Sequence, residues 1–246
     1  MGLKILLGIC YILFIIFVPL YDKAYWPEPS KKSLSFKVVA ASSFVGIGIL
    51  GMLLTDNESQ YAQIMIIGLI CGWFGDILMH IPPKKDMTCL YIGAAGFLVG
   101  HIFYVAAFVN ATSSLVSDYS FVTTPEFIVF LVVYLVFILM LKPVFRFNFS
   151  SRFMQFGLYL YGIFLIGMLI KAFVFAVTYF QNGAENNLIA TIILVIASVS
   201  FFISDLTLGI RLLGGRKDSK FIKSLSLYAY FLAQLLLSTS ILFIKA

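Results

Sequence analysis

A few polar side chains interrupt the long apolar stretches of this chain, and they are Lys37, Asp76, His101, Lys171, Asp205 and Gln234. Ionisable groups inside apolar spans are costly and usually face a bundle interior or a wet cavity, so they are the first functional candidates. Two carboxyl groups in one such site suit acid–base chemistry. One gives a proton while the other, ionised, stabilises a cation or activates water.

These residues belong to a chain with the composition of an integral membrane protein. Of its 246 residues, 61% are hydrophobic and 11% are charged, against about half and about a quarter in soluble domains. Such apolar richness excludes a disordered chain or a disulfide-rich secreted scaffold. The net charge of +6 does not indicate nucleic-acid binding, because the basic residues lie in short gaps between apolar runs. Cys10, Cys71 and Cys89 form no CxxC motif and predict neither a disulfide framework nor a thiolate metal site.

Eight apolar segments are long enough to cross a bilayer, which takes roughly 20 helical residues. We therefore predict an all-α bundle of eight transmembrane helices, forming one domain over residues 1–246. A β-barrel is excluded because the apolar runs are continuous rather than alternating. The first segment is expected to be a retained span, since it lacks the cleavage site of a signal peptide. The predicted segments are about 3–21, 35–54, 61–81, 88–110, 125–143, 153–180, 188–213 and 222–244.

Basic residues are distributed asymmetrically along this pattern. Of the 17 Lys and Arg residues, 14 lie in or beside the gaps that follow the first, third, fifth and seventh segments. The positive-inside rule then makes those gaps cytoplasmic and places both termini outside. We expect a multi-pass membrane protein, located in the cell membrane if the source is bacterial.

This orientation places several polar side chains at one depth. Asp76 and Asp205 come roughly 8–12 Å inside the cytoplasmic boundary, at about 1.5 Å per helical residue. His101 and Gln234 approach the same layer on helices that run the other way, and Lys37 lies at the cytoplasmic mouth. The spacing from Asp76 to His101 resembles that from Asp205 to Gln234, which suggests a 4+4 parallel repeat with its site at the interface.

Each candidate also has a simpler structural interpretation. Either Asp could be paired with a neighbouring Lys only to hold helices together. His101 could serve only as a hydrogen-bonding group between helices, and Lys37 only as a topology signal. Lys171 is expected to snorkel toward the outer face. His80, four residues after Asp76 on the same helix face, is expected to hydrogen-bond locally.

Four short motifs carry a resemblance to a known family. They are Gly-Asp-Ile-Leu-Met at 75–79, Gly-Phe-Leu-Val-Gly-His-Ile-Phe-Tyr at 96–104, Ile-Ser-Asp-Leu-Thr-Leu at 203–208 and Tyr-Phe-Leu-Ala-Gln at 230–234. In their order and placement, and in the length and number of spans, the chain resembles the YhhN family of eight-helix membrane proteins, which includes the lysoplasmalogenases. One departure is Val38 after Lys37, where the family often has proline.

The resemblance implies hydrolysis of the vinyl ether bond of lysoplasmalogens, which are 1-alkenyl glycerophospholipids without an sn-2 acyl chain. The products would be a fatty aldehyde and glycerophosphoethanolamine or glycerophosphocholine, and no cofactor is expected. The two acids would be Asp76 and Asp205. We prefer Asp76 as the ionised one, because it lies nearer the surface and beside His80. The expected supporting or substrate-binding residues are His101 and Gln234 for orientation, Lys37 for the phosphate, and Tyr104, Tyr230 and His80.

Two other functions stay open at this point. A zinc-dependent hydrolase would need an Asp as third ligand beside His80 and His101. A proton-coupled transporter or lipid carrier would also use intramembrane acids, although gathering near one face favours an enzyme. A purely structural protein is disfavoured, because each polar group in the apolar layer is costly without a partner. The sequence leaves the oligomeric state open, a homodimer included.

Overall fold

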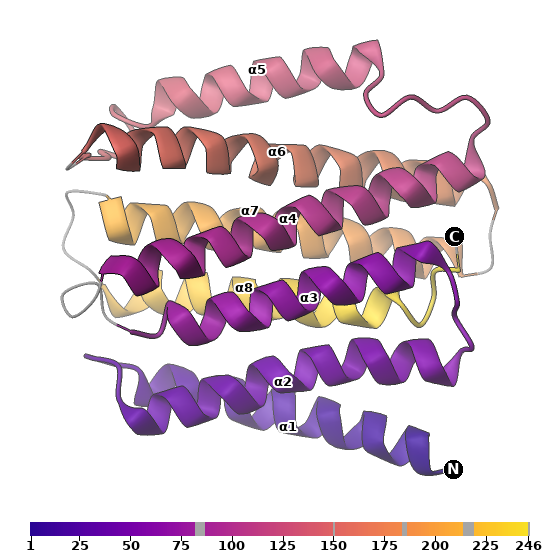
Figure 1. The fold of residues 1–246 in the computed structure, drawn as a ribbon, viewed down its shortest axis with the longest axis horizontal. Coiled ribbons are helices and arrows are strands. Elements are labelled where there is room, and N and C mark those ends of the chain that lie inside the picture. The colour runs from indigo at the N-terminus through magenta and orange to yellow at the C-terminus, as the bar shows by residue number, and fades with distance from the viewer. Residues whose placement is uncertain (82–86, 150, 184–185, 214–218, 246) are drawn as a thin grey trace.

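A computed structural model describes residues 1–81, 87–149, 151–183, 186–213 and 219–245. The described residues form a helical bundle in which successive helices run in opposite directions, so that the start of α1 and the end of α8 lie at the same end (Figure 1). The helices are α1 (Gly2–Ala24), α2 (Lys31–Leu54), α3 (Gln60–Leu78), α4 (Met87–Leu115), α5 (Thr124–Met140), α6 (Arg152–Gln181), α7 (Asn187–Leu213) and α8 (Lys220–Ser240).

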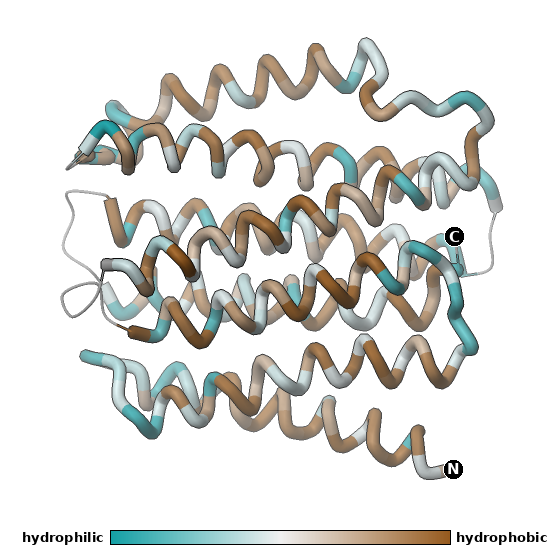
Figure 2. Tube along the Cα trace, in the orientation of Figure 1, coloured by the Kyte–Doolittle hydropathy of each residue, from teal (hydrophilic) through white to brown (hydrophobic). Residues whose placement is uncertain are grey.

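The helices correspond to the eight predicted segments. Seven of them are long and apolar enough to cross a membrane, while α5, with 17 residues, is shorter. At 1.5 Å per residue α5 measures roughly 25 Å, slightly less than a bilayer core of about 30 Å. Apolar residues run along the helices, and hydrophilic ones are most frequent near the ends and in the loops (Figure 2). The chain is therefore a multi-pass membrane protein, and its predicted orientation stays a prediction.

Six helices close into a ring, and two lie outside it. Around the ring, α2 contacts α3, α3 contacts α4, α4 contacts α6, α6 contacts α7, α7 contacts α8, and α8 returns to α2. Outside the ring, α1 packs mainly on α2 and α5 packs on α6, at opposite edges of the bundle (Figure 1). The polar residues of α3, α4, α7 and α8 therefore meet inside one ring.

Glycine residues bring α3 and α4 into backbone contact. A Cβ atom on Gly75 would lie 3.1 Å from the carbonyl oxygen of Gly93, and one on Gly96 would lie 3.4 Å from the Cα atom of Gly75. Small residues at such crossings allow membrane helices to approach closely. This contact sets the relative position of Asp76 on α3 and His101 on α4.

The end of α3 differs from its predicted boundary. The apolar run predicts a helix to residue 81, but α3 ends at Leu78 and the chain turns at residues 79–81. Opposite this turn, Ser30 caps the start of α2 by accepting a hydrogen bond from the backbone N–H of Ser33, whose hydroxyl in turn accepts from the N–H of Ser30. The early stop changes the position of His80.

Candidate active site

Both predicted acids line one cavity. It lies at the end of the bundle where α1, α3 and α7 finish and α2 and α8 begin. It is open to the outside, and its empty space, counted together with the open solvent at its mouth, is about 570 Å³. Asp76 and Asp205 contribute carboxyl groups, and Lys37, Arg211 and Lys223 contribute positive charge. The apolar part of the wall consists of Met79, Phe97, Leu208, Leu227 and Phe231. An apolar pocket with a few convergent charged groups is the usual form of a small-molecule or lipid site.

Both carboxyl oxygens of Asp76 have close partners. The Lys37 Nζ atom lies 3.0 Å from Oδ1 and also donates to the Asp76 main-chain oxygen at 2.8 Å. On the other side, the Tyr230 hydroxyl donates to Oδ2 at 2.7 Å. Asp76 is only 2% exposed, and a buried carboxylate requires such compensation. Both oxygens accept hydrogens from neighbouring groups, as an ionised carboxylate does.

A chain of buried donors fixes the direction of the Tyr230 proton. The Tyr104 hydroxyl donates to Gln234 Oε1 at 2.8 Å, and Gln234 Nε2 donates to the Tyr230 oxygen at 3.0 Å. Because the Tyr230 oxygen accepts from Gln234, its own proton points to Asp76. The chain therefore runs from α4 through α8 to α3, with each proton directed toward the carboxylate.

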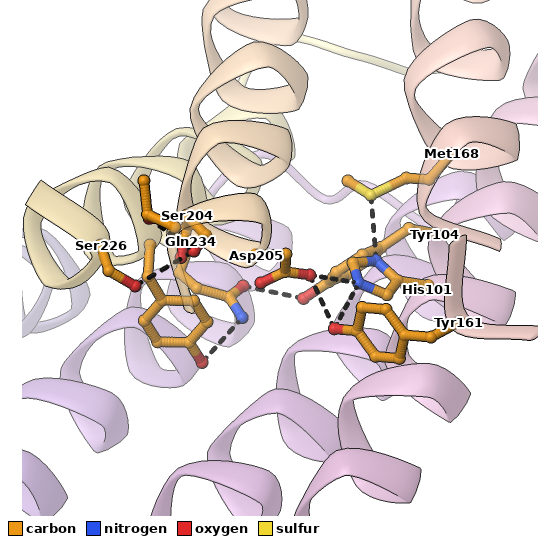
Figure 3. Close-up of polar contacts among 10 residues, drawn as sticks. His101, Tyr104, Tyr161, Met168, Ser204, Asp205, Ser226 and Gln234 are labelled. Atoms are coloured by element: carbon orange, nitrogen blue, oxygen red, sulfur yellow. Dashed lines mark hydrogen bonds and ion pairs between the residues drawn. The ribbon is translucent and has the colours of Figure 1, made fainter. Parts of the chain in front are cut away.

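Asp205 has a different set of partners. His101 Nε2 lies 2.9 Å from Asp205 Oδ2, and the Tyr161 hydroxyl donates to the same oxygen at 2.6 Å. His101 Nε2 and the Tyr161 oxygen are 3.1 Å apart. The other imidazole nitrogen, Nδ1, lies 3.2 Å from Met168 Sδ. Figure 3 shows Asp205, His101 and Tyr161 pointing toward one another, with Met168 on the opposite side of the imidazole from Tyr161.

The two carboxyl networks adjoin through one aromatic ring. The Phe201 ring centroid lies 4.8 Å from that of His101 and 5.7 Å from that of Tyr230. Phe201 is 1% exposed. The ring contacts a member of each network, so that apolar packing holds the two networks beside each other.

Most of the predicted site residues therefore come together. Asp76, Asp205, Lys37 and Tyr230 line the cavity. Behind them, His101 contacts Asp205 and Gln234 donates to Tyr230, and Tyr104 in turn donates to Gln234.

His80 lies apart from this group, and its predicted position on the Asp76 face is wrong. Because α3 stops at Leu78, His80 turns toward the start of α2, where Nε2 lies 3.1 Å from the Ser30 carbonyl oxygen and 3.2 Å from Ser33 Oγ. Burial lowers the pKa of His80 to about 4, with a smaller contribution from the nearby Lys37 charge. His80 therefore does not support an ionised Asp76; Lys37 and Tyr230 do.

The prediction that Lys171 snorkels to the outer face is also wrong. Lys171 is 6% exposed and forms an ion pair with Glu126 in the first turn of α5. Its ammonium group also donates to the Tyr119 hydroxyl at 3.0 Å and to the Phe121 carbonyl oxygen. The segment before α5 folds over this cation, which joins α5 to α6 at the end of the bundle opposite the cavity.

Four residues of the candidate site were not predicted from the sequence. Arg211 and Lys223 had served only as topology signals, although both line the cavity. Tyr161 and Met168 lie in an apolar run of α6 and carry no sequence signal of their own. Their importance follows from the packing of α6 against α4 and α7, which brings them to His101 and Asp205.

The two histidines considered as zinc ligands have separate partners, Ser30 and Ser33 for His80 and Asp205 for His101. Within the described ranges, no three His, Cys, Asp or Glu side chains gather closely enough to hold a metal ion.

Fold and site together define a polytopic helical membrane protein with two carboxyl groups on the wall of one largely apolar cavity. The model of the YhhN family matches residues 32–241, and the chain belongs to this family. The comparisons with curated proteins and with solved structures give no match.

Proposed function

We propose that this protein is a lysoplasmalogenase, a hydrolase of the vinyl ether bond in 1-alkenyl lysoglycerophospholipids. The observation that carries the proposal is the placement of Asp76 and Asp205 on the wall of one cavity in an apolar bundle. Membership of the YhhN family supports it. The products are a fatty aldehyde and glycerophosphoethanolamine or glycerophosphocholine.

Paired carboxyl groups suit this reaction step by step. A protonated carboxyl group transfers its proton to the vinyl carbon that is not bonded to oxygen. The C=C electron pair forms the new C–H bond, which leaves an oxocarbenium ion. The ionised carboxylate removes a proton from water as the water oxygen bonds to that cation, which gives a hemiacetal. The carboxyl group that took the proton from water then protonates the departing glycerol oxygen. At the same time, the carboxylate that gave its proton to carbon takes the hydroxyl proton of the hemiacetal. Both carboxyl groups thereby return to their starting states. Glycosidases divide the same type of work between two carboxyl groups.

The positive charges of the cavity suggest how the lipid is oriented. Lys37, Arg211 and Lys223 all line the cavity, and we assign the lipid phosphate to this group of cations. The alkenyl chain then lies against the apolar wall formed by Phe97, Leu208 and Leu227. In a bacterial source, the substrate would enter from the cell membrane.

The proposal extends to the origin of the site in a 4+4 repeat. Asp76 on α3 is contacted from α2 by Lys37 and from α8 by Tyr230, whereas Asp205 on α7 is contacted from α6 by Tyr161 and from α4 by His101. If α1–α4 are exchanged with α5–α8, so that each helix takes the place of the one four positions away, the set of helices around Asp76 becomes the set around Asp205. Asp205 also follows Asp76 by the same number of residues as Tyr230 follows His101. On this pairing His101 corresponds to Tyr230, not to Gln234.

Aldehyde release tests the function. Purified protein in mixed micelles is given lysoplasmenylethanolamine or its saturated 1-alkyl analogue, which has no C=C bond to protonate. We expect a fatty aldehyde and glycerophosphoethanolamine in equal amounts from the alkenyl lipid and no product from the alkyl lipid. Binding of the alkenyl lipid without any aldehyde would contradict the proposal and favour a lipid carrier.

A further inference from the structure

The contacts of His101 define where its protons lie. Met168 Sδ carries no hydrogen and can only accept, so the 3.2 Å contact with Nδ1 is favourable when Nδ1 carries a proton. His101 is fully buried, which keeps water from replacing the sulfur as a partner. The tautomer of an imidazole is set by the hydrogen bond that one of its nitrogens makes.

With Nδ1 protonated, the remaining contact requires one further proton. His101 Nε2 and Asp205 Oδ2 are 2.9 Å apart, a hydrogen-bond distance between two atoms that both have lone pairs. The proton lies either on Nε2, giving an imidazolium–carboxylate pair, or on Asp205, giving neutral imidazole and carboxylic acid. Either way, the pair holds one proton more than neutral histidine and carboxylate would. The Tyr161 hydroxyl, which donates to the same Oδ2 at 2.6 Å, supplies its own proton and does not remove this requirement.

Asp76 has no comparable proton. An ammonium group at Oδ1 and a hydroxyl donor at Oδ2 leave its carboxylate ionised, and the donor chain through Gln234 keeps the Tyr230 proton directed to it. The two carboxyl groups in the cavity are therefore inequivalent before a substrate arrives.

We infer that Asp205 is the acid that protonates the vinyl ether, and that Met168, His101 and Tyr161 are positioning residues that keep a proton on the His101–Asp205 pair. The catalytic part of this inference rests on the proposed function, whereas the proton count rests on the contacts alone. In the first step the proton leaves Asp205 for the outer vinyl carbon, and His101 is then the neutral imidazole with Nδ1–H still directed to Met168. Asp76 is the group that takes the water proton.

Other titratable groups face this pair. They are Tyr161 on α6, Tyr104 on α4, whose ring centroid lies 6.5 Å from that of His101, and, on the wall of the shared cavity, Asp76, Arg211 and Lys223. The partner of Nδ1 that the described part of the chain supplies is Met168 Sδ. Replacing Met168 therefore perturbs the proton on Nδ1 without removing a charged group.

The matched variants are Met168→Leu and Met65→Leu. Both methionines are buried, leucine has a similar volume, and the sulfur of Met168 is the one that contacts His101 Nδ1 at hydrogen-bond distance. Without its acceptor, His101 can place its proton on Nε2 and donate to an ionised Asp205, which lowers the fraction of enzyme that holds the acid proton. We expect Met168→Leu to lower kcat by about 3- to 10-fold, which is the change in rate that corresponds to the free energy of one weak hydrogen bond. KM should stay unchanged, and the fall in rate at high pH should begin at a lower pH.

Nitrogen NMR reads the proton directly and needs no activity. The chain has two histidines, so the His80→Gln variant labelled with ¹⁵N-histidine reports His101 alone. We expect Nδ1 to be protonated in this protein and to lose that proton in part when Met168→Leu is added. Met65→Leu should change neither the spectrum nor kcat.

The outcomes separate this inference from the proposed function. Nδ1 protonated, together with a slower Met168→Leu enzyme, supports both. An unprotonated Nδ1, or an unchanged kcat and pH profile in Met168→Leu, overturns the inference even if aldehyde release is confirmed. Complete absence of aldehyde release removes the proposed function, and the spectrum still decides the proton count.

Discussion

Gly72 tests whether the donor chain that ends at Asp76 matters. A Cβ atom at this position would lie 2.6 Å from Gln234 Nε2 and 3.4 Å from the Tyr230 hydroxyl. The clash is relieved by moving the Gln234 amide, which is the end of a flexible side chain. Moving it breaks the bond from Gln234 to Tyr230 and the bond from Tyr104 to Gln234.

The expected free-energy change in Gly72→Ala follows from these contacts. Each of two buried hydrogen bonds costs about 1–3 kcal/mol when its partner is left unsatisfied, and alanine in place of glycine in a helix returns up to about 1 kcal/mol. We expect Gly72→Ala to lose about 1–5 kcal/mol of stability. Its kcat should fall about 10-fold or more, because the Tyr230 proton is no longer directed to Asp76 and hydrogen bonds to charged groups are the stronger ones.

The control is Gly157→Ala on α6, where a Cβ atom would meet nothing within 4 Å. Unfolding in mixed micelles gives the stability of each variant, and aldehyde release gives kcat. Gly157→Ala should match or slightly exceed the wild-type stability with full activity. A Gly72→Ala protein that is as stable and as active as Gly157→Ala would refute the reasoning.

Three further predictions follow from other parts of the molecule. Burial lowers the pKa of His80 to about 4 from its usual 6.5. Between these two pH values the unfolded chain binds a proton that the folded protein does not. The contribution of His80 to stability should therefore be full above pH 6.5 and should be lost as the pH drops toward 4. Unfolding midpoints at pH 7 and pH 5 should show this fall in the wild type and a smaller one in His80→Gln. Glu126→Gln leaves the buried Lys171 cation without its carboxylate partner, and the loss should be about 3–5 kcal/mol in an unfolding titration, while kcat of the folded fraction stays unchanged because α5 lies away from the cavity. Arg211→Gln should raise KM for lysoplasmenylethanolamine but not for 1-alkenylglycerol, which has no phosphate; an equal effect on both lipids would refute the phosphate assignment.

Sequence patterns were sufficient for the helices and for the two acids. Continuous apolar runs define membrane helices because every backbone polar group must be satisfied within the segment. Asp76 and Asp205 are conspicuous because carboxyl groups are costly in such runs. Counting residues from the basic loops predicted one depth for both, and in the structure both line one cavity.

The partners of these acids were not predictable in the same way. Membrane helices are apolar all round, so the pattern does not show that α4 packs on α6 or that α8 returns to α2. Tyr161 and Met168 reach His101 only because α4 packs on α6. The hydrogen bond from Tyr230 to Asp76 depends on how α8 lies beside α3. His80 and Lys171 were misplaced for related reasons: an apolar run does not mark the turn after Leu78, and it does not show that Glu126 reaches α6.

The most direct test of the account is aldehyde release from lysoplasmenylethanolamine by the wild type, Asp76→Asn and Asp205→Asn at matched levels of folded protein. Removal of a group that acts as acid or base typically costs about 10²–10⁴-fold in rate. The account predicts aldehyde from the wild type and a loss of that size in both variants. Wild-type activity that survives either substitution would contradict the claim that the two carboxyl groups of this cavity carry out the reaction.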